Sequence, residues 1–323
     1  MKALCVFSGG LDSILAAELI RSQGIDVLAL FFETPFFTSQ RAIRSAQTVD
    51  LPIKVVDITR RHLEVVKKPK HGFGGNMNPC IDCHALMFRI AGEMLEQEGA
   101  HFILSGEVLG QRPMSQNRKS LMRVSSESGY GDLLLRPLSA KNLAITVPEE
   151  KGWVDRERLL DFQGRTRKPQ LEMAGNLNIS DYPTPAGGCL LTENGFSRRL
   201  KDLLTLHENP EIREIELLKL GRHFRITPQA KLVVGRNKNE NIQIRSLSAQ
   251  TDIMLASTEG PGPTVLGLGD FSDESIELAA AVTAAYSDSE EGKITTIRLL
   301  TGKKEKILMA KSSKKEAFKT YML

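Results

Sequence analysis

The chain has 323 residues, a formal net charge of +4, and a composition that is 41% hydrophobic and 25% charged. This length suffices for two domains of ordinary size, and the composition excludes a disordered chain. The longest apolar runs, such as 27–32, are far too short to cross a bilayer, so we expect no membrane partner. Because Met1 and Lys2 lead directly into a strand without a signal peptide, we expect a cytoplasmic protein whose four cysteines stay reduced.

The charge is unevenly distributed along the chain. Residues 303–323 contain seven lysines against two glutamates. Further basic clusters lie at 60–62, 67–71, 165–168, 198–199 and 222–225. Such clusters are either solvated faces or surfaces that bind a polyanion, and the sequence leaves both interpretations open.

The first half alternates predicted strands and helices. Buried strands rich in Val, Ile, Leu and Phe are expected at 3–7, 26–32, 53–58 and 101–105. Helical patterns lie between them at 14–23, 39–49 and 84–97. This alternation predicts an α/β fold with a doubly wound parallel sheet. Ligands in such folds bind at the carboxyl ends of the strands, where residues 8–13 follow the first strand.

The second half is organised differently. Residues 140–205 form a predicted bridge, with helices near 155–162, 168–177 and 196–206. A smaller α+β unit follows, with a helix at 275–285 and strands at 224–226, 231–234, 241–245, 252–255, 264–268 and 294–300. We therefore expect a first domain at 1–165, a connecting segment at 166–208 and a small C-terminal domain at 209–323.

The turn between the first strand and the first helix reads Ser8-Gly9-Gly10-Leu11-Asp12-Ser13. Such a turn points several backbone N–H groups at one spot, at the positive end of the helix dipole. Asp12 is the informative residue, because a site for a polyphosphate can use a carboxylate to bind Mg²⁺. The string is not a Walker A loop, since no Gly-Lys-Ser/Thr follows. As chemistry alone, it also fits a tight turn and a helix cap.

The whole string closely resembles the SGGxDS signature of the PP-loop ATP pyrophosphatases. The resemblance implies that Ser8, Gly9, Gly10, Leu11, Asp12 and Ser13 hold the pyrophosphate of ATP, with Mg²⁺ near Asp12. It also implies that a substrate oxygen attacks the α-phosphate, so that an adenylated intermediate forms and pyrophosphate leaves. The adenine in that family lies near the end of the second strand, which here includes Leu30 and Phe32.

Two later stretches resemble tRNA-thiolating members of this superfamily. The segment SGEVLGQRPMSQNRKSL, residues 105–121, is similar to the GE-x-x-GQ-x-x-SQ segment of tRNA 4-thiouridine synthases, with one extra residue between Gln111 and Ser115. LLRPL follows at 134–138, as it does in that group. The positions that match the motif are Glu107, Gly110, Gln111, Ser115 and Gln116. The resemblance implies that Gly106, Gln111, Ser115, Gln116 and Arg136 bind the nucleotide.

NPCIDC and PAGGCLLT look instead like the paired cysteine segments of tRNA 2-thiouridylases. Both resemblances imply an ATP-dependent tRNA sulfurtransferase that adenylates a uridine carbonyl and replaces its oxygen with sulfur. Its partners would be tRNA and a sulfur donor, either sulfide or a persulfide carrier protein. The resemblance to thiolation enzymes covers about residues 1–205. We recognise in it neither the N-terminal RNA-binding module nor the rhodanese-like domain of many 4-thiouridine synthases. KLGRHFR and VVGRNKNEN resemble instead a small domain of nucleic-acid-associated proteins, so residues 209–323 are a candidate RNA-binding unit.

The cysteines divide into one predicted core residue and three candidate site residues. Cys5 lies inside the first strand and is most simply a small core residue. Cys80 and Cys83 are one helical turn apart at the start of a helix, near Lys70 and His71, so we expect their pKa values to fall. Cys189 follows Gly187-Gly188, a flexible approach that brings it against a distant segment.

Four chemistries fit these thiols. The first is a persulfide that a second cysteine resolves by forming a disulfide. The second is a [4Fe–4S] cluster held by Cys80, Cys83 and Cys189, with one iron left open for sulfide. The third is structural zinc with His84 or His71 as the fourth ligand. The fourth, covalent haem at the CxxCH of residues 80–84, conflicts with the cytoplasmic location. We favour the cluster, because a persulfide mechanism does not need the third thiol.

Other functions remain open on the sequence. One is a PP-loop ligase that acts on a small molecule and needs no cysteine centre. A second is a non-catalytic, zinc-containing protein that binds RNA or nucleotides. A third is removal or processing of thiolated nucleotides.

Overall fold

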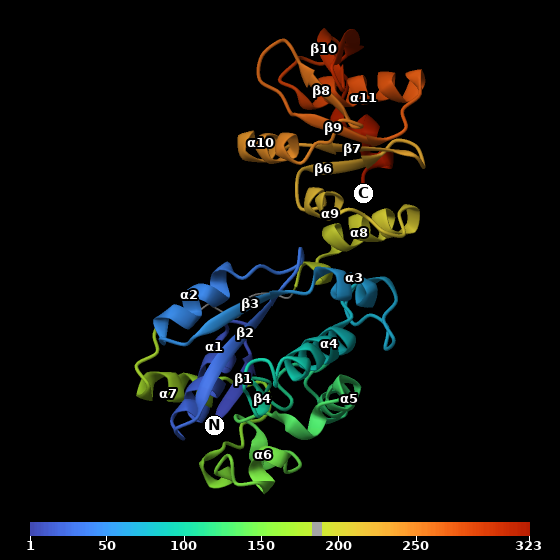
Figure 1. Cartoon of the computed structure of the whole chain (residues 1–323). Coiled ribbons are helices and arrows are strands. Elements are labelled where there is room, and N and C mark those ends of the chain that lie inside the picture. The colour runs from blue at the N-terminus through green and yellow to red at the C-terminus, as the bar shows by residue number, and fades with distance from the viewer. Residues whose placement is uncertain (183–188) are drawn as a thin grey trace. The chain divides into compact units, whose positions relative to one another are not determined.

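The computed structural model describes residues 1–182 and 189–323 (Figure 1). The chain divides into two compact units, Met1–Thr192 and Glu193–Leu323. The division lies inside the segment that the sequence indicated as a connection. Within the described residues, no helix has the length and apolar character that a membrane span requires.

The first unit is built on a parallel sheet of five strands in the order β3-β2-β1-β4-β5. The strands are β1 (Lys2–Val6), β2 (Asp26–Glu33), β3 (Ile53–Asp57), β4 (Phe102–Ser105) and β5 (Leu134–Leu135). Each pairs in parallel with its neighbours, which confirms the predicted sheet. The strand order reverses beside β1, and the carboxyl edge at such a reversal is where doubly wound sheets bind ligands.

Helices cover both faces of this sheet (Figure 1). They are α1 (Leu11–Arg21), α2 (Gln40–Thr48), α3 (Thr59–Lys67), α4 (Cys80–Glu93), α5 (Arg118–Ser128), α6 (Val147–Glu150) and α7 (Lys168–Asn176). Ala3 and Cys5 of β1 share one buried core with α1, α2 and α7, whereas Leu4 shares the other with α4 and α5. The alternation of β1 side chains between two cores confirms the doubly wound arrangement, and Cys5 is a core residue as predicted.

One helix prediction in the bridge is wrong. The segment 155–162 contains only the 3₁₀ turn Arg156–Arg158. The backbone N–H groups of Leu160 and Phe162 instead donate to the carbonyls of Pro137 and Leu138, at 3.0 and 2.8 Å. The polar spacing of this stretch resembles that of a helix, but its backbone N–H groups bond instead to the turn that follows the last strand of the sheet.

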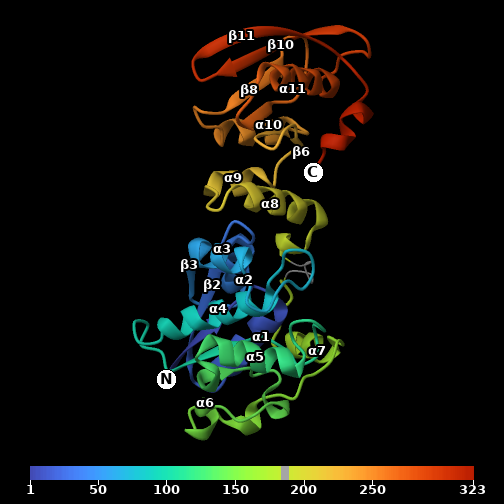
Figure 2. The same ribbon diagram turned by 90° about the vertical axis from the view of Figure 1, so that its right-hand side faces the viewer.

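The second unit is the predicted smaller α+β unit. Its antiparallel sheet has the order β11-β10-β8-β9-β7-β6, with β6 (Arg222–Arg225), β7 (Ala230–Val234), β8 (Ile253–Ser257), β9 (Val265–Gly269), β10 (Ile294–Thr301) and β11 (Lys304–Lys311). Its helices are α8 (Asn194–Leu206), α9 (Ile212–Leu217), α10 (Lys238–Ser246) and α11 (Asp273–Tyr286). Helix α11 lies against one face of this sheet (Figure 2).

The predicted strand at 241–245 is also wrong, because these residues belong to α10. The side chain of Asn237 accepts a hydrogen bond from the backbone of Glu240 at 3.0 Å and caps this helix. Asn and Asp favour such caps, and the cap lies outside the apolar pattern that indicated a strand.

The end of β4 packs directly on the start of α1. A Cβ added at Gly106 would lie 2.5 Å from both the carbonyl carbon of Asp12 and the backbone nitrogen of Ser13. Real side chains do not tolerate such a contact with backbone, so only glycine fits at this position. The chain that follows β4 is therefore held against the first turn of α1.

We expect Gly106→Ala to destabilise the first unit by about 1–3 kcal/mol, because the new methyl group must push two backbones apart. Gly175→Ala in α7 is the matched control, since nothing lies within 4 Å of its added Cβ; we expect a gain of up to about 1 kcal/mol there. Trp153 is the only tryptophan of the chain and lies in this unit. Its fluorescence during urea unfolding measures both effects, and equal stability of the two variants would contradict this packing.

Candidate functional site

The β1–α1 turn keeps its shape through its own side chains. Gly9 has a φ of 75°, and an added Cβ would lie 2.7 Å from the Cα of Ala42 on α2. The Ser13 hydroxyl donates to the Gly10 carbonyl at 2.8 Å and lies 3.3 Å from the Ser8 hydroxyl. Gly10 is the N-cap of α1 and caps it with no side chain. The Ser13 N–H donates to the Gly10 carbonyl at 3.0 Å, which leaves the N–H groups of Leu11 and Asp12 in the first turn for an anion.

Asp12 is held by one oxygen only. Its Oδ2 accepts a hydrogen bond from Gln111 Nε2 at 2.8 Å, and Gln111 Oε1 in turn accepts one from Gln170 Nε2 at 3.1 Å. Its Oδ1 is buried without a hydrogen-bond partner among the described residues. A buried carboxylate oxygen left without a donor is a suitable ligand for a hard cation such as Mg²⁺. The hydrogen bond from Gln170 of α7 was not predicted, because no sequence motif marks this residue.

The loop after β4 lies beside the turn, as Gln111 shows by its hydrogen bond to Asp12. Gly110 has a φ of 77°, and its N–H donates to the Gln116 carbonyl at 2.7 Å. Ser115 and Gln116 are buried, and Gln116 Oε1 has no partner within the described part of the chain. The structure thus brings these predicted residues to the same edge of the sheet as the SGGLDS turn.

Glu107 is the centre of a buried ionic network. Its Oε2 lies 2.9 Å from Arg136 Nε, and its Oε1 lies 2.8 Å from His84 Nδ1. Burial alone raises the pKa of Glu107, but the Arg136 charge and the His84 hydrogen bond outweigh it and lower that pKa to about 2. Arg136 also donates to Ser125 Oγ at 3.0 Å. The predicted role of Arg136 toward the nucleotide stays a prediction, because its guanidinium is engaged with protein groups here.

Leu30 and Phe32, predicted near the adenine, are buried in the core that β2 shares with α4. They end a strand at the carboxyl edge, and their predicted proximity to the base is untested.

The candidate cysteines come together through the loop that precedes α4. Asn76 Nδ2 donates to the Thr192 carbonyl at 2.6 Å, and the Met77 N–H donates to the Leu191 carbonyl at 3.2 Å. Thr192 in turn donates its N–H to the Cys189 carbonyl at 2.8 Å. These bonds tie the Cys189 segment to the loop before α4, and the shared role of the three cysteines stays a prediction. The Gly187-Gly188 approach lies outside the described residues.

The predicted low pKa values of the α4 cysteines are wrong. Burial raises the pKa of Cys83, and the nearby Cys189 and Cys80 raise it further. Burial also raises the pKa of Cys80, against a smaller opposing effect of Arg112. The cations expected to act here are engaged elsewhere, since Lys70 pairs with Glu127 at 2.7 Å and His71 with Asp82 at 2.8 Å. The mutual effect of Cys83 and Cys189 also indicates that the two thiols are close.

A buried histidine beside Cys83 was not foreseen. His62 Nε2 lies 3.2 Å from Cys83 Sγ, and the ring contacts Phe36 and Phe37 with centroids 5.5 and 5.4 Å away. Burial lowers the pKa of His62 to about 4, so the ring is neutral near neutral pH. The sequence grouped His62 with a basic cluster at 60–62, but its helical spacing on α3, which was not predicted, turns it inward.

No preformed metal site stands out in the residues that the structure describes, where no group of three or more His, Cys, Asp and Glu side chains is arranged to hold an ion. The two histidines proposed as zinc ligands contact carboxylates through Nδ1, His71 at Asp82 and His84 at Glu107.

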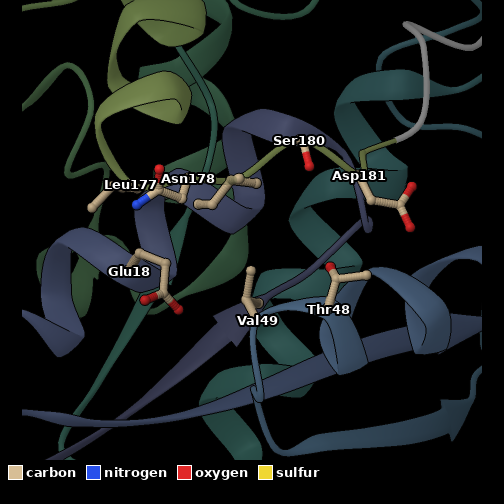
Figure 3. Close-up of a pocket in the computed structure, with 8 residues that line it drawn as sticks. Glu18, Thr48, Val49, Leu177, Asn178, Ser180 and Asp181 are labelled. Atoms are coloured by element: carbon tan, nitrogen blue, oxygen red, sulfur yellow. The ribbon is translucent and has the colours of Figure 1, made fainter.

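A separate hollow of about 250 Å³ lies between α1, the end of α2 and the segment after α7 (Figure 3). Glu18, Thr48, Leu177 and Asp181 are among its lining residues. It contains none of the predicted site residues, and Glu18 is paired with Arg21 at 2.7 Å.

The fold and the SGGLDS turn define the first unit as a PP-loop-like α/β domain. Comparisons with known proteins agree: residues 1–145 match the family model for thiamine biosynthesis protein (ThiI), and residues 221–322 match that for the NFACT protein RNA binding domain. The resemblance to PP-loop tRNA thiolation enzymes is thereby confirmed for the N-terminal segment.

A curated relative and two solved structures are also similar. The chain is 29% identical over 162 residues to a probable tRNA sulfurtransferase of Oceanobacillus iheyensis, a match that covers 47% of this chain and 38% of the relative. A predicted subunit of tRNA methyltransferase from Methanocaldococcus jannaschii aligns at 16% identity and a TM-score of 0.33, covering 42% of this chain and 67% of that chain. The C-terminal part of the fibronectin/fibrinogen-binding protein from Streptococcus suis aligns at 12% identity and a TM-score of 0.30, covering 75% and 90%.

We expect Arg136→Met to destabilise the first unit by about 3–5 kcal/mol near pH 7, because it leaves the Glu107 carboxylate buried without its charged partner. Since the folded pKa of Glu107 is lowered from 4.5 to about 2, its stabilisation is complete above the ordinary carboxyl pKa and is lost as the pH falls toward about 2. The difference between wild type and variant should therefore shrink over that acidic range.

Arg61→Met is the matched control for this prediction. Arg61 pairs with Glu93 at 2.6 Å, but both side chains are more than two-fifths exposed, at 46% and 43%. We expect its loss to cost less than about 1 kcal/mol. Urea unfolding followed by Trp153 fluorescence at several pH values measures both variants, and similar losses would contradict the importance of the buried pair.

Proposed function

We propose that this protein is an ATP-dependent tRNA sulfurtransferase. The observation that carries the proposal is that one short loop, residues 106–112, contacts both the SGGLDS turn and the cysteine helix. On one side, Gln111 bonds to Asp12 at 2.8 Å, and Gly106 packs on the backbone of Asp12 and Ser13. On the other, Glu107 bonds to His84 of α4 at 2.8 Å, and the charge of Arg112 acts on Cys80. A nucleotide-activating site and a thiol centre that share one loop can act on the same substrate.

The first half-reaction uses the β1–α1 turn. The uncapped N–H groups of α1 suit the phosphates of ATP, and Asp12 Oδ1 would hold Mg²⁺, which neutralises charge on the leaving pyrophosphate. The carbonyl oxygen of a uridine attacks the α-phosphorus, the bond between the α-phosphorus and the bridging oxygen breaks, and pyrophosphate leaves with that electron pair. Gln111 keeps Asp12 Oδ2 fixed, so that Oδ1 remains directed at its ligand.

The second half-reaction uses the cysteines. A sulfur nucleophile at the Cys80, Cys83 and Cys189 centre attacks the activated carbon of the base, and AMP leaves with the former carbonyl oxygen. If the sulfur is carried as a persulfide, a second thiolate then attacks the inner sulfur to form a disulfide, and a thiol reductant restores the pair. Cys80, Cys83 and Cys189 would alternatively hold a [4Fe–4S] cluster, which would supply the sulfide to be transferred.

The RNA must present an accessible base. Enzymes that modify a base act on unpaired or splayed-out nucleotides, so we expect an unpaired uridine of tRNA as substrate. Phosphate contacts from the basic clusters would make binding weaken steeply with salt.

Asp12→Asn should lower tRNA-dependent pyrophosphate release by about 100-fold or more, because it removes the charge that faces the metal-bound phosphates. Asp161→Asn is the control, since Asp161 is exposed and lies outside the site. Cys189→Ser should leave pyrophosphate release intact and abolish thiolation. Labelled ATP with unmodified tRNA measures release, and mass spectrometry of the nucleosides measures thiolation. Pyrophosphate release that does not depend on tRNA and persists in Asp12→Asn would refute the activity. Full activity of a variant that lacks Cys80, Cys83 and Cys189 would favour a ligase.

Anaerobic purification should yield about four irons and matching sulfide per chain if the thiols hold a cluster, with a brown absorption that Cys80→Ser removes. Cys5→Ser is the control for nonspecific loss, because Cys5 lies in the core of β1. One zinc per chain, or sulfur released by cyanide without iron, would contradict the cluster and support the zinc or the persulfide chemistry in its place.

A further inference from the structure

The second unit leaves half of one sheet face uncovered. Helix α11 packs on one face, and α9 and α10 pack on the other face over β7 and β9. On that second face, beyond β9, Arg298 of β10 lies opposite Ala256 of β8 and Ile307 of β11. Ile307 and Met309 are 51% and 67% exposed. This half-face is therefore an apolar strip open to solvent.

A hollow of about 210 Å³ lies on this half-face. Met254 and Ala256 of β8 and Leu300 of β10 line it together with two arginines, Arg245 of α10 and Arg298 of β10. It is smaller than the roughly 300–1,000 Å³ of typical small-molecule sites, so it suits one flat group rather than a whole cofactor.

The two arginines are available to a ligand. Arg245 is oriented by a hydrogen bond from its Nε to Thr264 Oγ1 at 3.0 Å. Within the described chain, neither Arg245 nor Arg298 is ion-paired with a carboxylate. Lys311 lies on the same face, opposite Ile294 at the end of the β10–β11 ladder. Two carboxylates border this half-face: Glu305 lies opposite Leu300 in the ladder, and Glu259 Oε1 accepts a hydrogen bond from Thr296 Oγ1 at 2.7 Å.

Arginine and an apolar surface together are the groups that bind unpaired nucleotides. A base can stack on an aliphatic surface or on a guanidinium plane, and the same guanidinium binds phosphate through two parallel hydrogen bonds. The charge on the half-face itself favours a polyanion, because Arg245, Arg298 and Lys311 lie on it.

We propose that this hollow holds an unpaired nucleotide of the RNA substrate. The base lies on the Met254 and Leu300 surface, and its phosphates contact Arg245 and Arg298, with Lys311 continuing the path of the strand. The inference rests on the proposed function, since it takes tRNA as the partner, and it adds the surface by which the second unit binds it.

Binding of the full-length chain to a labelled single-stranded RNA of about a dozen nucleotides and to unmodified tRNA tests the proposal. The double variant Arg245→Gln/Arg298→Gln should weaken binding to the single-stranded RNA by about 10- to 100-fold and reduce the salt dependence by about one phosphate contact or more. Leu300→Ser changes no charge and should still weaken binding by about 5-fold or more through lost stacking.

Lys238→Gln is the matched control, because it removes one exposed positive charge from the same helix as Arg245. We expect less than about a threefold change. Equal losses in all variants, or wild-type binding by the double variant, would overturn the proposal. So would an acidic peptide that displaces the RNA and loses affinity with the same substitutions, since the surface would then bind a protein.

Pyrophosphate release separates the two proposals. If the wild-type chain binds RNA through this hollow but never turns over ATP, the proposed function fails and the RNA surface stands. If thiolation proceeds and the double variant binds RNA and reacts like wild type, the function stands and the surface fails. Circular dichroism of each variant checks that the second unit remains folded.

Discussion

The structure of the candidate site depends on the close approach of two backbones at Gly106. A single Cβ there would collide with Asp12 and Ser13, so the chain leaving β4 lies directly on the first turn of α1. This packing also positions the residues that follow. Glu107 is hydrogen-bonded to His84 on α4, and Gln111 is hydrogen-bonded to Asp12. A glycine packed at the topological switch point therefore determines which side chains of two distant segments can meet.

Burial raises the pKa of both kinds of acid at this edge, but the partners of only one of them reverse the outcome. Glu107 and Cys83 are both buried, yet the pKa of Glu107 is lowered and that of Cys83 is raised. The difference lies in their partners, since Glu107 has the Arg136 charge, whereas Cys83 has the neutral His62 and two further thiols. A buried thiol without a cationic partner stays protonated and is a poor nucleophile. Cys80 and Cys189 are half-buried and are therefore the more accessible of the three thiols.

The parts of the structure that could be predicted from the sequence are those determined by residues close together in the chain. Buried strands show as runs of apolar residues, and the SGGLDS turn shows as a string, so the parallel sheet and its ligand-binding edge were predictable. Gln170 and His62 were not, because each meets its partner, Gln111 or Cys83, only through tertiary packing. The predicted strand at 241–245 was wrong because a second local signal is present. The side chain of Asn237 caps a helix there, and these residues belong to α10. Strand β11 was not predicted, because its lysines interrupt the alternation of apolar and polar residues. Charged side chains are common on exposed edge strands.

The two units carry complementary chemistry. In the first unit, Asp12 and Glu107 are held in fixed positions by hydrogen bonds from Gln111 and Arg136. The second has an open, charged half-face with an apolar floor and no comparable network of buried reactive groups at that hollow. Binding energy from phosphates and a stacked base can be gained there without disturbing the reactive geometry.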